Sequence, residues 1–380
     1  MSAPLVIIGS GFAAYQLVKT LRRQNTEMAI QVFTADSGDE YNKPDLSHVF
    51  TRQQAADDLI SLTGEAFAKQ HQIELFANTR VEEVNAQAHI ITVNGVSYPY
   101  SKLVLATGAK AFVPQLKGDA TKGVVTLNSL QEYRHSQQRI ADSSRILIMG
   151  GGLIGVELAM DLASSGRQVR IVEPSAHLLA NLMPDFVATA LEQQLRSDGM
   201  QMDCLSYVTA IDRSADGLSV TTSNGTQYDT DCVISAAGLV PNVELAKLAG
   251  AEVNRGIVVD KQLRTSVEDI YALGDCAEID GKVMAFLQPI VLSANTLASH
   301  LLSNSSELHI PAMMVKVKTP SYPIQLGGQY DPSSSWQVSF AEQGVMAKAY
   351  DQEQRLTGFV VTQGNVKQAF PLLREVQTAK

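Results

Sequence analysis

Closely spaced glycines follow a short apolar run at two places in this 380-residue chain, far apart in the sequence. The first run is Leu5–Ile8, followed by Gly9, Gly11 and Ala14. The second is Ile146–Met149, within a predicted strand Arg145–Met149, followed by Gly150, Gly152 and Gly155. The first glycine makes a tight strand-to-helix turn, the second lets backbone approach a pyrophosphate, and the third small residue lets helix and sheet pack closely. Two such βαβ units predict an α/β fold with two doubly wound, three-layer parallel sheets that bind dinucleotides.

The residues after each glycine segment indicate where the nucleotides bind. Phe12 and Ala13 begin one predicted helix, over residues 12–24, and Leu153 and Ile154 begin the other, over residues 153–165. Unpaired N–H groups and the positive end of the helix dipole stabilise a diphosphate there. Two dinucleotides in one chain are typical of a flavoprotein that passes a hydride between them.

An acidic residue follows the second predicted strand of each unit. Strand Ile30–Thr34 leads to Asp36, and strand Gln168–Glu173 ends in Glu173. The acid of such a unit stands about 20 residues beyond the glycines and binds the adenosine ribose hydroxyls. A carboxylate there repels a 2′-phosphate, so Glu173 predicts NADH rather than NADPH. Arg170 lies on the same strand, but alternation directs its side chain elsewhere.

Composition is that of an ordinary globular protein. Hydrophobic residues make up 45% and charged residues 18% of the chain, and its length predicts two or three domains. The net charge of −9 argues against a nucleic acid or an anionic membrane as partner.

The sequence shows no membrane or export signal. No stretch approaches the ~20 apolar residues of a membrane span, and the first residues lack the basic flank and cleavage site of a signal peptide. A cytoplasmic protein is expected.

Cysteine usage excludes a thiol relay. Cys204, Cys232 and Cys276 are an odd number with no CxxC spacing. They are expected to be buried thiols in a reducing compartment, without a disulfide or a metal site. Electrons leaving a flavin in this protein would therefore not pass through a dithiol.

Further strands are predicted along the rest of the chain. Ser101–Ala106 runs into Thr107 and Gly108, and Cys232–Ala236 runs into Gly238. After about residue 306, alternating segments predict a small antiparallel C-terminal domain of the α+β type, with Trp336 in its core; these segments are Met314–Lys318, Trp336–Phe340 and Val345–Ala349.

Five ordered motifs resemble those of the FAD-dependent pyridine-nucleotide reductases, and they cover residues 1 to about 308. Besides the two glycine segments they are Glu40–Ser47, Leu103–Gly108, and Thr265-Ser266 followed by Ile270–Asp275. The resemblance implies that Asp275 binds the ribityl chain of FAD and that Lys43 lies at the flavin diphosphate or beside the ring, where it would stabilise negative charge on the reduced flavin. It also implies that Glu157 faces the nicotinamide and orients its carboxamide.

The site residues expected from motifs and resemblance together form two sets. The catalytic pair is Glu157 and Lys43, with no metal. FAD is expected at Gly9, Gly11, Phe12, Ala13, Ala14, Asp36, Lys43, Pro44, Thr107, Gly108, Asp275 and Gln288. NAD(H) is expected at Gly150, Gly152, Leu153, Ile154, Gly155, Glu157, Glu173 and Gly238.

Three segments resemble the rubredoxin reductase branch of that family, and the whole length resembles its members from anaerobic nitric oxide detoxification. They are Asp39–His48, Leu287–Ala294 and Val315–Pro320. The resemblance implies one FAD and single-electron transfer to a rubredoxin, or to the rubredoxin domain of a flavorubredoxin. Because rubredoxins are acidic, a local basic docking surface is expected, and Lys316 and Lys318 are candidates on one face of a strand.

Some assignments stay open. The lysine pair could instead protect a sheet edge. His48 stands where related ferredoxin reductases usually have a lysine; it could donate a proton near the flavin, although a structural, hydrogen-bonded histidine is the stronger expectation. Lys318-Thr319-Pro320 stands where those enzymes have an aromatic residue.

Three other functions remain alternatives. An NADH oxidase or peroxidase would place a redox cysteine soon after the first βαβ unit, and no cysteine precedes Cys204. A ferredoxin reductase of an oxygenase system and a non-catalytic FAD/NAD redox sensor would carry the same binding motifs.

The order of the motifs predicts an inserted domain. The FAD-binding domain is expected over residues 1–112 and 243–308, the NAD-binding domain over 113–242, and the C-terminal domain over 309–380.

Overall fold

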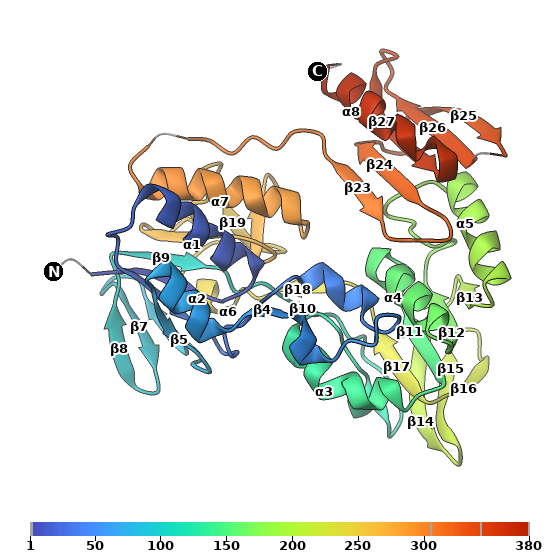
Figure 1. Cartoon of the computed structure of the whole chain (residues 1–380), viewed down its shortest axis with the longest axis horizontal. Helices are drawn as coiled ribbons and strands as arrows, with labels where there is room; N and C mark the ends of the chain where they lie inside the picture. The colour runs from blue at the N-terminus through green and yellow to red at the C-terminus, as the bar shows by residue number, and fades with distance from the viewer. Residues whose placement is uncertain (1–2, 305, 343, 379–380) are drawn as a thin grey trace. The chain divides into compact units, whose positions relative to one another are not determined.

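The computed structural model describes residues 3–304, 306–342 and 344–378, which divide into two compact units (Figure 1). Unit 1 comprises the chain up to Lys43, Ala56–Lys110 and Leu239–Ile310; unit 2 comprises Pro44–Ala55, Ala111–Gly238 and the chain from Pro311. The short segment Pro44–Ala55 therefore groups with unit 2, although the residues on both sides of it belong to unit 1. Across the described residues, no helix is both long and apolar enough to cross a membrane.

Unit 1 is built on a parallel five-stranded sheet. Its strands follow the order β20 (Ile270–Ala272), β9 (Lys102–Leu105), β1 (Leu5–Ile8), β2 (Ile30–Phe33) and β5 (Glu74–Phe76). Its helices are α1 (Phe12–Gln24), α2 (Gly64–His71), α6 (Glu244–Leu248) and α7 (Leu287–Leu301). The smaller strands are β3 (Glu40–Tyr41), β4 (Ile60–Leu62), β6 (Glu83–Asn85), β7 (Ile90–Val93), β8 (Val96–Pro99), β18 (Leu239–Pro241), β19 (Ile257–Val259), β21 (Ala277–Ile279) and β22 (Lys282–Val283).

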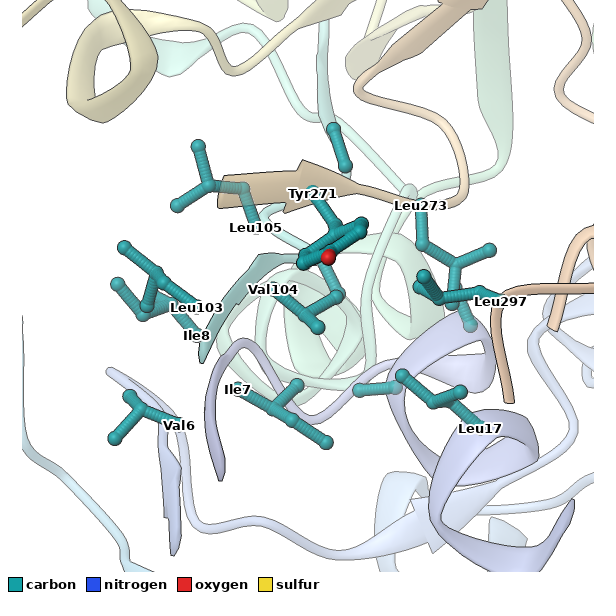
Figure 2. Close-up of a cluster of buried hydrophobic side chains, with 14 of the residues drawn as sticks. Val6, Ile7, Ile8, Leu17, Leu103, Val104, Leu105, Tyr271, Leu273 and Leu297 are labelled. Carbon is teal, nitrogen blue, oxygen red and sulfur yellow. The ribbon is translucent and has the colours of Figure 1, made fainter. Parts of the chain in front are cut away.

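The central strand β1 is apolar and buried along its whole length, and its neighbours are mostly apolar, because both faces of the sheet are covered. Ile7, Val104 and Tyr271 are register neighbours, and Figure 2 shows them on the same side as Leu17 of α1 and Leu297 of α7. The alternate residues of β1 and β9 point to the opposite side and are buried as well. Helices α1 and α7 lie next to one another, joined by a hydrogen bond between Thr20 and Asn295.

Unit 2 contains a second parallel sheet with the same local arrangement. Its strands follow the order β13 (Gln201–Cys204), β12 (Gln168–Glu173), β11 (Arg145–Met149) and β17 (Cys232–Ser235). The helices are α3 (Leu130–Ala141), α4 (Leu153–Ser164) and α5 (Asp185–Ser197), and an antiparallel group consists of β14 (Val208–Ser214), β15 (Gly217–Thr222) and β16 (Gln227–Thr230). In both sheets the strand before the glycines lies between two parallel neighbours, as β1 does between β2 and β9, which confirms the predicted doubly wound fold.

The C-terminal part of unit 2 is the expected small α+β structure. A five-stranded antiparallel sheet has the order β23 (Met314–Val317), β24 (Ile324–Gly328), β27 (Leu356–Thr362), β26 (Gly344–Tyr350) and β25 (Ser335–Ala341). Helix α8 (Ala369–Thr378) packs on it through Leu372 and Val376, which contact the cluster around Phe359.

The expectation that Trp336 lies in this core is wrong. Trp336 is half-buried on β25, at the edge of the sheet. Its ring packs edge-on against Tyr330, at 4.7 Å, and against Phe186 of α5, at 5.6 Å. The indole therefore covers the side of α5 instead of filling the space under α8.

Candidate functional site

The first glycine segment forms a cradle at the N-terminus of α1 in unit 1. Gly9 has a φ of +115°, and a Cβ there would lie 2.2 Å from the carbonyl oxygen of Ala106, so only glycine fits. Gly11 is exposed, has a φ of −72°, and a Cβ built on it would meet nothing within 4 Å. Ala14 is fully buried where helix and sheet pack. The fold thus requires a glycine at position 9 and a small residue at position 14, whereas nothing in the fold requires a glycine at position 11.

The second cradle, in unit 2, repeats this pattern at the N-terminus of α4. A Cβ on Gly150 would lie 2.5 Å from the carbonyl oxygen of Ala236, and one on Gly155 would lie 2.0 Å from that of Gly150. Gly152 is again exposed, with a φ of −73° and open space around its Cβ position. Of all glycines that the structure describes, Gly11 and Gly152 alone combine an ordinary φ with open space.

The helices that start at these cradles have uncapped N-termini. In the described part of the chain, no side chain accepts a hydrogen bond from the first turn of α1, α4 or α7 in the capping position. Thr63 caps α2 and Ser129 caps α3, whereas α5 and α6 also lack a side-chain cap. Free N–H groups at a helix N-terminus bind a phosphate well. Gln288, a predicted FAD residue, is exposed in the first turn of α7.

Other predicted FAD residues of unit 1 lie close to the first cradle. A Cβ on Gly274 would lie 2.6 Å from the Cβ of Ala13, so the turn that carries Asp275 contacts the start of α1. The carboxylate of Asp275 lies 3.4 Å from the ammonium of Lys43, and both side chains are partly exposed. The two residues were each predicted from a separate motif, and the structure brings them close enough to contact one polar ligand together. Asp36 is exposed just after β2.

Thr107 and Gly108 are fixed by a partner that the sequence did not reveal. The hydroxyl of Thr107 donates to the carbonyl of Asn242 at 2.7 Å, and the amide of the Asn242 side chain donates back to the carbonyl of Thr107 at 2.8 Å. The backbone N–H of Asn242 donates to the carbonyl of Gly108 at 2.9 Å. In the sequence, Asn242 is marked only by its position four residues after Gly238. That spacing does not identify Asn242 as the hydrogen-bond partner of Thr107.

Glu173 supports the second cradle directly. Its carboxylate accepts a hydrogen bond from the N–H of Gly151 at 2.6 Å and another from the N–H of Ser175 at 2.7 Å. The predicted acid thus stands beside the glycines. Arg170 points away, as predicted: it forms an ion pair with Asp203 and stacks over Tyr228.

Glu157 is 7% exposed on α4, and both of its oxygens are occupied. The Ser47 hydroxyl donates to Oε2 at 3.0 Å, and the backbone N–H of Lys318 donates to Oε1 at 2.9 Å. The ammonium of Lys318 donates to the carbonyl of Pro44 at 2.8 Å. Neither Ser47 nor Lys318 was predicted to contact Glu157.

One helical turn further along α4, Asp161 holds the same segment of chain. It is 5% exposed and accepts from the backbone N–H of Phe50 at 2.8 Å and from the hydroxyl of Thr51. Glu157 and Asp161 lie on one face of α4 because residues four apart are neighbours on a helix. Asp161 has no place in the glycine fingerprint, so sequence reasoning missed it.

One expectation about the charged residues changes. Lys318 is partly buried and bound to Pro44, so its ammonium is not free for docking; Lys316 is exposed on β23. Burial and the neighbouring Lys318 lower the pKa of His48, although Glu157 and Asp161 act in the opposite direction. The structure shows no hydrogen bond to the His48 ring among the described residues, so both expectations for His48 stay predictions.

Cys232 and Cys276 are buried free thiols, as predicted, whereas the free thiol Cys204 is only partly buried. Burial raises the pKa of Cys204 and of Cys232 to about 11, and it also raises the pKa of Cys276. Thiols with such pKa values are protonated at neutral pH and react slowly.

Residues 3–296 match the pyridine nucleotide-disulphide oxidoreductase family. The chain belongs to this family. Residues 307–376 match a domain described as the rubredoxin binding C-terminal domain.

Relatives of the chain extend over its whole length. The nitric oxide reductase FlRd-NAD(+) reductase of Aliivibrio fischeri is 54% identical over 100% of both chains, and that of Shigella sonnei is 46% identical over 98% of this chain and 99% of its own. The NADH:rubredoxin oxidoreductase of Clostridium acetobutylicum, a solved structure, is 19% identical and has a TM-score of 0.82 over 100% of this chain and 96% of its own. This structure supports the fold alone.

Proposed function

We propose that this member of the family is an FAD-dependent reductase that takes a hydride from NADH and passes electrons singly to a rubredoxin, or to the rubredoxin domain of a flavorubredoxin. The match of residues 307–376 to a rubredoxin binding domain supports the class of acceptor. The name that the relatives carry supports NAD(+) as the nucleotide and nitric oxide reduction as the wider system.

The open space at Gly11 and Gly152 carries the proposal. A glycine that the fold itself does not need costs conformational entropy, and here it occurs at the N-terminus of an uncapped helix in each unit. A dinucleotide diphosphate needs this combination of accessible N–H groups and missing side chain. The residues present therefore fit one dinucleotide in each unit.

We assign FAD to unit 1. The first cradle of Gly9, Gly11 and the start of α1 would hold its diphosphate, and Asp36 the adenosine ribose. The adjacent Lys43 and Asp275 would contact the flavin end, the ammonium near negative charge and the carboxylate at the ribityl hydroxyls. Thr107, Gly108 and Gln288 would complete this site.

We assign NADH to unit 2. Gly150, Gly152 and the start of α4 would hold the diphosphate, and Gly238, exposed three residues after β17, would border it. Glu173 would bind the ribose hydroxyls and repel a 2′-phosphate. We keep the expected domain boundaries, residues 1–112 with 243–308 for FAD, 113–242 for NAD and 309–380 for the C-terminal domain, except that Pro44–Ala55 groups with unit 2.

The bound cofactors would supply the hydride exchange and the one-electron chemistry. The chain's own part is to bind and orient: Glu157, held by Ser47 and Lys318, accepts one hydrogen bond on each oxygen and so keeps further lone pairs for the amide N–H groups of a nicotinamide. The raised pKa values of all three cysteines support electron exit without a thiol step. Free thiols also support a reducing, cytoplasmic location.

The test uses purified protein under anaerobic conditions. Its visible spectrum should show bound flavin, stopped-flow mixing with NADH should bleach the flavin band faster than mixing with NADPH, and added rubredoxin should be reduced catalytically. Protein that stays colourless after incubation with FAD would refute the cofactor assignment. Flavin reduction without transfer to rubredoxin would favour a redox sensor.

A further inference from the structure

One residue of the C-terminal domain is bound to Glu157 and to the segment beside it. Lys318 directly follows β23 and makes two hydrogen bonds of different kinds: its backbone N–H donates to Glu157 Oε1 at 2.9 Å, and its ammonium donates to the carbonyl of Pro44 at 2.8 Å. The Ser47 hydroxyl lies within hydrogen-bonding distance of both Glu157 and Pro44, at 3.0 and 3.1 Å. These four residues form a closed ring of contacts, all within unit 2.

The ring explains how a carboxylate can stay almost fully buried. Removing a charged group from water is costly unless hydrogen bonds replace the hydration. For Glu157 the replacement comes from a hydroxyl on one oxygen and a backbone N–H on the other, so the orientation of the carboxylate is set by Ser47 and Lys318 together. The ammonium of Lys318 in turn anchors Pro44, three residues before Ser47, and so fixes the segment that supplies the hydroxyl.

Lys318 therefore differs from a lysine that recruits a partner by charge. A docking lysine must have an exposed, unengaged ammonium, as an electrostatic contact at the rim of an interface requires. Lys316, two residues earlier, is exposed, whereas Lys318 is partly buried with its ammonium engaged. Side-chain alternation places both lysines on the same face. They differ because the ammonium of Lys318 contacts Pro44 of η1 (Lys43–His48).

We propose that Lys318 is a positioning residue for hydride transfer: it fixes the orientation of Glu157 through its backbone and the position of the Pro44–Ser47 segment through its ammonium. This inference rests on the proposed function, in which Glu157 orients the nicotinamide. It also gives the rubredoxin binding domain, to which Lys318 belongs, a part in the NADH half-reaction.

The test compares three variants of the full-length protein. Lys318→Met removes the ammonium and keeps the side-chain length and the backbone N–H. Lys318→Arg keeps a charged donor. Lys348→Met, the matched control, removes a partly buried lysine of the same sheet, on β26, that lies outside the ring.

Three measurements are made on each variant. Anaerobic stopped-flow gives the rate of flavin reduction at saturating NADH and steady-state assays give the KM for rubredoxin. Hydrogen exchange, which needs no activity, gives the protection of the Phe50 and Thr51 N–H groups, both of which donate to Asp161 on α4. Loss of the Pro44 anchor should loosen this segment.

For Lys318→Met we expect flavin reduction about tenfold slower, the size of one charged hydrogen bond, with faster exchange at Phe50 and Thr51 and an unchanged KM for rubredoxin. Lys318→Arg should stay within about threefold of wild type, because a charged donor still reaches the Pro44 carbonyl. Lys348→Met should match wild type in all three measurements.

Three outcomes would overturn the inference. They are a Lys318→Met variant with normal flavin reduction and a raised KM for rubredoxin, an unchanged exchange rate at Phe50 and Thr51, or equal losses in the Met and Arg variants. A wild-type protein that NADH does not reduce would instead refute the proposed function, and the exchange data would still decide whether Lys318 holds the segment.

Discussion

Replacing Gly152 by alanine adds one methyl group, and this change should weaken ligand binding without lowering the stability of the fold. The backbone at Gly152 has a φ of −73°, which alanine adopts without strain, and the added Cβ meets no protein atom within 4 Å. At such a position, a glycine-to-alanine change stabilises a protein by about 0.4–1 kcal/mol, because it restricts the unfolded chain. The folded protein should therefore be as stable as wild type or slightly more stable.

Binding of NADH should change in the opposite direction. The new methyl group would stand at the uncapped N-terminus of α4, where a diphosphate must approach the backbone closely. Forcing one extra methyl group into a packed contact costs about 1–3 kcal/mol, which corresponds to roughly a 5- to 150-fold weaker affinity for NADH. Binding of FAD in unit 1 should not change, because Gly152 belongs to unit 2.

The assay combines a stability measurement with a binding measurement on the same preparation. Urea unfolding followed by circular dichroism gives the free energy of unfolding, and titration of the apoprotein gives the Kd for NADH. The matched variant is Gly155→Ala, three residues further along: its Cβ would lie 2.0 Å from the Gly150 carbonyl oxygen, so it should lose stability as well as binding.

The reasoning fails if Gly152→Ala binds NADH like wild type, since the open space would then have no ligand. It also fails if this variant loses stability as Gly155→Ala does, since the space would then not be open. Gly11→Ala repeats the test in unit 1, where bound FAD should fall and stability should not.

Three further changes have measurable consequences. Glu173→Arg should reduce the ratio of kcat/KM for NADH to that for NADPH, because it removes the carboxylate that repels a 2′-phosphate; an unchanged ratio would place the ribose elsewhere. Asp161→Ala should lower the free energy of unfolding by about 2–4 kcal/mol, because buried donors of the Pro44–Ala55 segment lose their acceptor; urea unfolding measures this, and a change below 0.5 kcal/mol would contradict it. Burial lowers the pKa of His48, His71 and His300 below their ordinary value of 6.5, so the unfolded chain binds more protons in that range and stability should fall as the pH drops through about 6.5; unfolding curves with a constant midpoint between pH 7.5 and 5.5 would refute this.

The local structure around both cradles could be predicted from the sequence because it depends on neighbours along the chain. The residue bounds of β1, α1, β11 and β12 agree with the prediction, and those of β2 and α4 differ by one residue at the end. A few neighbouring residues encode each of these features. They are the apolar strand, the tight turn at Gly9 or Gly150, and the small residue where helix and sheet pack closely.

The amino-acid sequence by itself determined the doubly wound fold, the two glycine cradles and the lack of a CxxC dithiol, because these follow from short-range spacing and from cysteine count. Only the tertiary structure decided which side chains surround Glu157: Ser47 lies 110 residues before it and Lys318 lies 161 residues after it. It also decided that the Lys318 ammonium binds a carbonyl whereas that of Lys316 stays exposed. The physical reason is that burial and hydrogen bonding depend on which distant segments fold against α4, and residue type and spacing do not encode that.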